Sequence, residues 1–160
     1  MSKESKTKSG RLVRWLFVIS FVVMAFSGFG QMPIFKRYYI ADIPGMGWAA
    51  DFYLTHIIHY LGALFLLGFF SYLITEYLLS GRKRLRLTAA GVVRVLLLAG
   101  IVATGVVRVL KNLPDVTFSP TLTLVVDISH LGFMMVFLLA ALAFVLTKQK
   151  WVTARSNSTS

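Results

Sequence analysis

Long apolar stretches alternate with short polar segments along this chain. Four of them are long enough for a membrane-spanning helix, which takes about 20 residues; they cover residues 12–30, 52–79, 87–110 and 121–146. The pattern predicts an all-α integral membrane protein, a bundle of four transmembrane helices within residues 11–150. We expect a polar N-terminal segment at residues 1–10 and a disordered, Ser/Thr-rich tail at residues 151–160. No internal repeat is evident in the sequence.

Basic residues gather at one set of helix ends. Twelve of them flank what we define as the first side, namely Lys3, Lys6, Lys8, Arg11, Arg14, Arg82, Lys83, Arg84, Arg86, Lys148, Lys150 and Arg155. The other side has four: Lys36, Arg37, Arg108 and Lys111. Because Lys and Arg accumulate in cytoplasmic segments, we predict that both termini are cytoplasmic. The net charge of +11 then serves topology and contact with anionic lipid headgroups, and we expect no nucleic-acid partner.

The chain contains no cysteine. Disulfides, a Cys-ligated iron–sulfur cluster, a thiolate-ligated haem and covalent c-type haem attachment are therefore excluded. If this protein moves electrons, it uses a non-covalently bound cofactor or the clusters of a partner.

All three histidines lie inside apolar stretches, where an ionisable side chain is costly and a functional candidate. His56 and His59 are on the second stretch and His130 is on the fourth. His59 lies eight residues beyond Asp51 and His130 nine beyond Thr121, so at about 1.5 Å rise per residue they reach similar depth in the outer half of the bilayer. Two facing imidazoles at one level are the ligands of a bis-histidine haem b. We predict haem iron ligation by His59 and His130, with His56 an open alternative to His59.

Residues near the histidines suit this prediction, but each of them can also serve a simpler purpose. Arg108 and Lys111 can neutralise haem propionates or extend to lipid headgroups. Small residues can make room for the haem plate or allow close helix packing; they are Ser27, Gly28, Gly30, Gly62, Ala63, Gly100, Gly105 and Gly132.

Asp127 opens further alternatives. It can accept from an imidazole N–H, or it can form a quinone site together with His56. His56, His59, Asp127 and His130 can instead bind zinc or iron in a metal-dependent membrane enzyme. The histidines can also act only as hydrogen-bonding groups between helices in a haem-free anchor.

The pattern resembles the cytochrome b (gamma) subunits of respiratory formate dehydrogenases and nickel–iron hydrogenases. Three features carry the resemblance: Arg11-Leu-Val-Arg14-Trp15 followed by Phe26-Ser27-Gly28, then His59-Tyr-Leu-Gly62, then His130 on the fourth stretch. The resemblance covers most of the chain. It implies a non-catalytic electron-transfer subunit in a bacterial inner membrane, which passes electrons between a periplasmic partner and the quinone pool.

Two departures from the family pattern matter. Arg14 stands where the family has a ligand of its inner haem, and the second ligand would fall near Phe144. Because both inner ligands are missing together, the resemblance implies a single haem b on the outer side. The implied partners are a periplasmic iron–sulfur or multihaem electron-transfer subunit, a catalytic subunit, quinone and membrane lipids.

Overall fold

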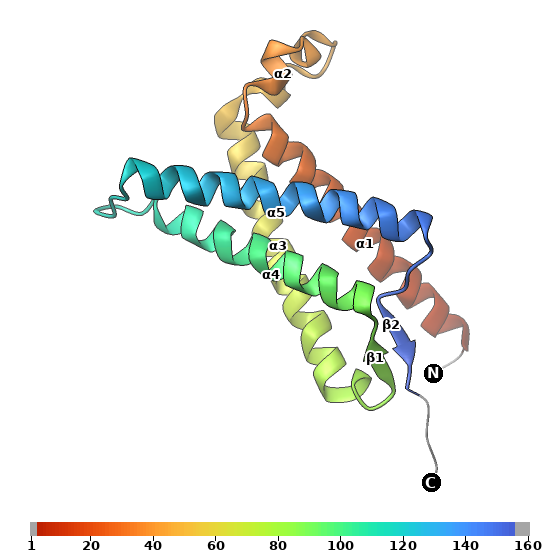
Figure 1. The fold of residues 1–160 in the computed structure, drawn as a ribbon. Helices are drawn as coiled ribbons and strands as arrows, with labels where there is room; N and C mark the ends of the chain where they lie inside the picture. Colours follow the sequence, from red (N-terminus) through yellow and green to blue (C-terminus); the bar gives the residue numbers. More distant parts are fainter. Residues whose placement is uncertain (1–2, 156–160) are drawn as a thin grey trace. The chain divides into compact units, whose positions relative to one another are not determined.

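The computed structural model describes the backbone of residues 3–155 and the side chains of residues 11–155 (Figure 1). Its helices are α1 (Lys3–Gly30), α2 (Ile34–Arg37), α3 (Phe52–Glu76), α4 (Ala89–Leu110) and α5 (Pro120–Leu146). Two 3-10 turns, η1 (Ile40–Asp42) and η2 (Gly47–Ala50), precede α3, and a π-helical turn, η3 (Tyr77–Gly81), follows it. The strands are β1 (Leu85–Leu87) and β2 (Val152–Ala154).

The prediction of four long apolar helices is confirmed for the described residues. Helices α1, α3, α4 and α5 are each long and apolar enough to cross a membrane. Large apolar side chains are exposed along all four of them, as expected of helices that face lipid instead of water. Insertion into a membrane and the side of each terminus stay predictions.

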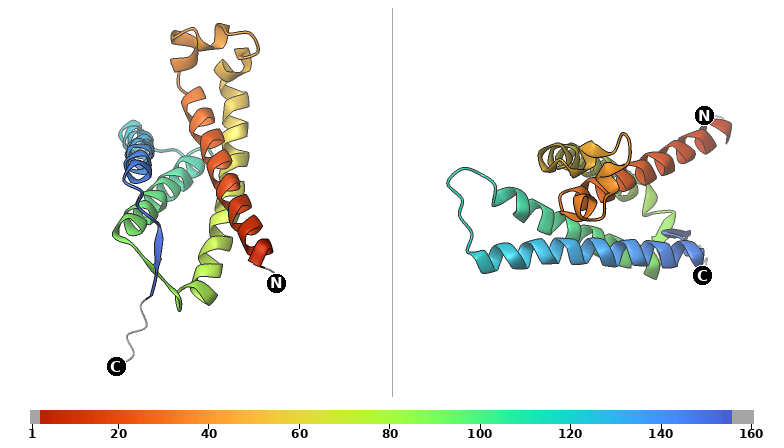
Figure 2. Two further views of the ribbon diagram at one scale, coloured as in Figure 1. Left: turned by 90° about the vertical axis from the view of Figure 1, so that its right-hand side faces the viewer. Right: turned by 90° about the horizontal axis from the view of Figure 1, so that it is seen from above.

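The chain divides into two units, with the boundary after Leu79. In the first unit, α1 and α3 lie side by side (Figure 2). The end of α1 meets the start of α3, where a Cβ added at Gly30 would lie 2.7 Å from Cγ2 of the buried Thr55. Farther from the connecting loop, the rings of Phe17 and Phe70 lie 6.1 Å apart. The two helices are therefore antiparallel.

The loop between α1 and α3 is folded against the end of α1. Phe26 contacts the rings of Phe35, at 4.9 Å between centroids, and Trp48, at 5.6 Å. Phe35 is buried. Asp51 then begins α3 as its N-cap, because its carboxylate accepts from the Leu54 backbone N–H at 3.0 Å. These contacts hold the loop where it can support the first turns of α3.

In the second unit, α4 and α5 are packed side by side as an antiparallel pair (Figure 2). Thr88 caps α4 by accepting from the Gly91 N–H at 2.9 Å, and Ser119 caps α5 by accepting from the Leu122 N–H at 3.2 Å. Pro120 is the first residue of α5, where its missing N–H costs nothing. These caps explain why both helices begin where they do.

The prediction of a disordered tail at residues 151–160 is wrong for Val152–Ala154. These residues form β2, antiparallel to β1 with Leu85 opposite Ala154. Thr88 donates to the Lys150 carbonyl at 2.6 Å, and the Trp151 carbonyl lies in close contact with Gly91, which has no Cβ in the way. Backbone pairing with β1 therefore orders this segment despite its polar composition. Residues 1–2 and 156–160 of the predicted terminal segments lie outside the described residues.

Arg94 connects this folded C-terminal segment to α4. Its side chain is 5% exposed, and Nη2 donates to the Gln149 carbonyl at 3.1 Å. The guanidinium carbon lies 4.6 Å from the ring centroid of Phe144 and 4.9 Å from that of Trp151. The cation is thus accommodated inside the unit by two aromatic faces and one carbonyl.

Candidate functional site

His59 is held by a hydroxyl from the neighbouring helix. Its Nδ1 lies 3.0 Å from Ser27 Oγ, and Ser27 donates its own hydroxyl proton to the Val23 carbonyl at 2.7 Å. While the hydroxyl donates to that carbonyl, its oxygen can only accept from Nδ1–H. This arrangement favours the Nδ1–H tautomer, whose lone pair is on Nε2, the nitrogen that can then bind a metal.

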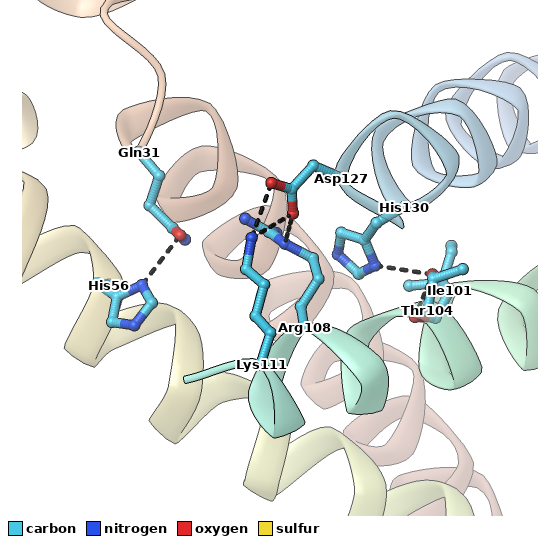
Figure 3. Close-up of polar contacts among 8 residues, drawn as sticks. All are labelled: Gln31, His56, Ile101, Thr104, Arg108, Lys111, Asp127 and His130. Atoms are coloured by element: carbon cyan, nitrogen blue, oxygen red, sulfur yellow. Dashed lines mark hydrogen bonds and ion pairs between the residues drawn. The ribbon is translucent and has the colours of Figure 1, made fainter. Parts of the chain in front are cut away.

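His130 has the same arrangement in the second unit (Figure 3). Its Nδ1 lies 3.0 Å from Thr104 Oγ1, and Thr104 donates to the Gly100 carbonyl at 2.7 Å. His130 also makes a hydrogen bond to the backbone of Ile101. Because the Thr104 hydroxyl is likewise bonded back to its own helix, the arrangement favours the tautomer with the proton on Nδ1 and the lone pair on Nε2.

A glycine lies under each of these two imidazoles. A Cβ added at Gly28 would lie 3.2 Å from His59 Cε1, and one added at Gly105 would lie 3.3 Å from His130 Cε1. Both distances are shorter than an ordinary van der Waals contact. Each glycine therefore lets the ring approach the adjacent helix closely enough for the hydroxyl bond.

His56 has a different environment. Its Nδ1 lies 3.1 Å from Gln31 Oε1 (Figure 3). Its ring stacks on Phe52, at 5.4 Å between centroids, and is tilted against Tyr60 at 4.2 Å. The acceptor for His56 is thus a flexible amide side chain, whereas His59 and His130 each contact a hydroxyl that is bonded back to its own helix.

Asp127 forms an ion-pair cluster with Arg108 and Lys111, which we call the charge cluster (Figure 3). Arg108 Nε donates to Oδ1 at 2.9 Å, and Lys111 Nζ donates to Oδ1 at 2.9 Å and to Oδ2 at 2.8 Å. All three side chains are partly exposed. Within the second unit His130 contacts Thr104, and Asp127 contacts the two cations, so a bond from an imidazole to Asp127 stays a prediction. Two cations on one carboxylate leave the charge cluster with a net charge of +1.

Two of the small residues near the histidines serve helix packing. A Cβ at Gly62 would collide with the Met24 sulfur at 2.6 Å, and one at Gly100 would collide with the Phe133 ring at 2.7 Å. Gly132 differs, since a Cβ there would meet nothing within 4 Å. Close packing therefore accounts for Gly62 and Gly100.

No group of three or more His, Asp or Glu side chains is arranged to hold a metal ion within either unit, as far as the side chains of residues 11–155 are concerned. In the second unit, the carboxylate of Asp127 is already occupied by two cations. The hypothesis of a zinc or iron enzyme gains no support from these contacts.

The structure brings Asp127, Arg108 and Lys111 together. His59 belongs to the first unit and His130 to the second, so their joint ligation of one iron stays a prediction. Sequence reasoning missed the roles of Ser27 and Thr104. The pattern that marks them is a hydroxyl residue followed by glycine on the helix that precedes each histidine helix.

Comparison of the chain with protein-family models, with curated proteins and with solved structures finds no match. A function for this chain must therefore be inferred from its own residues.

Proposed function

We propose that this chain is the membrane-anchor cytochrome b subunit of a multi-subunit respiratory oxidoreductase in a bacterial inner membrane. In this proposal His59 and His130 bind one non-covalent haem b. The chain passes electrons between the quinone pool and a periplasmic iron–sulfur or multihaem subunit, which connects it to a catalytic subunit. The observation that carries the proposal is the matched setting of the two imidazoles, each of which contacts through Nδ1 a hydroxyl that is bonded back to its own helix.

The donor chemistry of these histidines suits haem iron. A histidine that binds a metal through one nitrogen commonly donates its other N–H to a defined acceptor, which orients the ring and raises its basicity. Ser27 and Thr104 are such acceptors. A haem b with two imidazole ligands supplies one-electron transfer and offers no open coordination position to a substrate. The proposed role is therefore electron transfer without catalysis by this chain.

Topology supports the pairing of His59 with His130. A chain that crosses the bilayer four times has the loops at residues 31–51 and 111–119 on the same side. His59 lies seven residues beyond Phe52 and His130 ten beyond Pro120, the first residues of α3 and α5. At about 1.5 Å rise per residue, the depths of the two differ by about 5 Å. The distribution of Lys and Arg makes this the periplasmic side.

The charge cluster supports an anionic group near His130. Asp127 precedes His130 by one helical turn toward the loop, and Asp127 neutralises only one of the two cations that contact it. The remaining positive charge attracts an anion such as a haem propionate. In this proposal Arg108 and Lys111 neutralise a haem propionate in addition to Asp127.

We further propose that the quinone binds beside His56 and Asp127. His56 offers an imidazole flanked by the rings of Phe52 and Tyr60, and an aromatic surface of this kind suits a flat quinone ring. Asp127 is stabilised as a carboxylate by two cations. Because His56 donates Nδ1–H to Gln31 Oε1, its Nε2 is an acceptor, which suits the hydroxyl of a quinol.

One observation favours a second candidate function, that of a haem-free structural anchor. Each of His59 and His130 already connects its two helices through a hydrogen bond, and such bonds by themselves stabilise membrane helix pairs. The two candidates differ in whether the Nε2 lone pairs bind iron.

The reduced-minus-oxidised visible spectrum of the purified chain tests the proposal. We expect a sharp b-type α-band that is lost in His59→Ala and in His130→Ala. His56→Ala is the matched control on the same helix, and it should retain the band. A wild-type chain that is fully assembled but shows no b-type band would refute the haem proposal and favour the structural anchor.

A further inference from the structure

The two units present their histidines in the same way, although their sequences are not evidently repeated. In the first, Ser27 is followed by Gly28, and both face His59. In the second, Thr104 is followed by Gly105, and both face His130. Each hydroxyl bonds back to the carbonyl four residues earlier in its own helix.

The correspondence continues one helical turn toward the connecting loop. The residue four positions after the hydroxyl contacts the residue three positions before the histidine. In the first unit these are Gln31 and His56, 3.1 Å apart. In the second they are Arg108 and Asp127, 2.9 Å apart. A polar contact thus occupies the same position in both units, neutral in one and charged in the other.

One turn farther from the loop, each unit packs one large residue against a glycine, but the large residue is on the first helix in one unit and on the second helix in the other. Met24 on α1 packs against Gly62 on α3. In the second unit the small residue is Gly100 on α4 and the large one is Phe133 on α5. Gly62 and Phe133 each follow the histidine of their unit by three residues, so both units fill this layer with one bulky side chain.

Packing geometry alone explains only part of this match. Any antiparallel helix pair brings residues at such offsets into contact. It does not require a hydroxyl followed by glycine opposite a histidine. That feature is chemical, and both units have it.

We propose that Ser27 and Thr104 are matched positioning residues, and that the two units are versions of one histidine-presenting helix pair. Each hydroxyl holds its imidazole as the Nδ1–H tautomer, so that Nε2 is the ligand atom. Only the use of Nε2 to bind haem rests on the proposed function; the tautomer itself does not.

The same correspondence decides between the two histidines of α3. His56 corresponds to Asp127, whereas His59 corresponds to His130. His56 contacts the Gln31 amide, whereas His59 contacts a back-bonded hydroxyl as His130 does. On the proposed function, the correspondence therefore assigns His59 as the axial ligand of the first unit.

The imidazole ¹⁵N chemical shifts of the full-length chain, measured without haem in detergent or lipid, test the tautomer directly. We expect His59 and His130 to report protonated Nδ1 and unprotonated Nε2. Ser27→Ala should move His59, and Thr104→Ala should move His130, toward a mixture of tautomers. Ser27→Thr and Thr104→Ser keep the hydroxyl and should restore the wild-type shifts.

Two matched controls are available. Ser71 and Thr147 make the same bond to the carbonyl four residues earlier, on exposed positions of α3 and at the end of α5. Ser71→Ala and Thr147→Ala should leave both imidazoles unchanged. A wild-type chain in which His59 or His130 is protonated on Nε2 would overturn the inference, as would an equal response to Ser27→Ala and Ser71→Ala.

A redox titration of the haem-loaded chain separates this inference from the proposed function. Loss of the acceptor makes the imidazole a weaker donor to oxidised iron, so Ser27→Ala and Thr104→Ala should each raise the midpoint potential relative to the two controls. If neither substitution changes the midpoint potential of the haem, Ser27 and Thr104 do not position the imidazoles. If the wild type shows no b-type band, the proposed function fails and the ¹⁵N shifts alone decide the positioning role.

Discussion

Replacement of Gly100 by alanine should destabilise the second unit, whereas the same replacement at Gly132 should not. A Cβ at Gly100 would lie 2.7, 2.8 and 2.9 Å from three carbons of the Phe133 ring. A Cβ at Gly132 would meet nothing within 4 Å. Both glycines lie inside long helices of the same unit, so each is a control for the other.

The magnitude follows from two opposing effects. Alanine is favoured over glycine within a helix by about 0.8–1.0 kcal/mol, whereas overpacking costs about 1–3 kcal/mol. The first effect acts at both positions and cancels in their difference. Gly100→Ala should therefore be less stable than Gly132→Ala by about 1–3 kcal/mol. Phe133 is 37% exposed, so a rotation of its ring can reduce the penalty toward the lower end of this range.

Unfolding of the full-length chain by SDS in mixed micelles, followed by circular dichroism, measures both free energies. A second substitution, Phe133→Leu, removes the ring and should reduce the penalty of Gly100→Ala while leaving the effect of Gly132→Ala unchanged. Equal stabilities of the two alanine variants, or a penalty that survives the loss of the ring, would show that the Phe133 ring does not pack on Gly100.

Three further predictions concern the second unit. Asp127→Asn leaves two cations without a counter-ion and should lower the free energy of unfolding by about 1–2 kcal/mol. This range is already reduced for solvent screening, because the Asp127 side chain is 38% exposed. Adding Lys111→Met to Asp127→Asn should recover part of the loss in the same SDS assay. Trp151→Ala removes one aromatic face from Arg94 and should speed tryptic cleavage after Lys150, whereas Trp151→Phe keeps a ring and should not; equal cleavage of both variants contradicts the packing. Thr88→Ala removes the cap of α4 and should cost about 1 kcal/mol, with faster hydrogen exchange at the Gly91 amide; unchanged exchange would argue against the cap.

Much of the helical architecture was predictable from the sequence. The predicted stretches at 87–110 and 121–146 match α4 (Ala89–Leu110) and α5 (Pro120–Leu146) closely. The ends agree because Thr88, Ser119 and Pro120 are strong local signals for a helix start. The helix α1 begins earlier than the apolar stretch does, at Lys3, because Lys and Glu favour helix as readily as apolar residues do.

The C-terminal segment was not predictable in this way. Its composition is polar, which is typical of a disordered tail, yet Val152–Ala154 pairs with Leu85–Leu87. Those two segments are far apart in the sequence, and the antiparallel packing of α4 against α5 brings them together. Backbone pairing between distant segments leaves little trace in local composition.

The chain's own sequence determined which segments are apolar helices, that all three histidines lie inside them, and that no cysteine is available. Only the tertiary structure decided that Asp127 contacts two cations, and that His59 and His130 each contact a hydroxyl, of Ser27 or Thr104, that is bonded back to its own helix. The physical reason is that α3 and α5 are apolar almost all round. A helix of that kind has no polar face to indicate its rotation, and a hydrogen bond between two helices depends on the rotation and register of both.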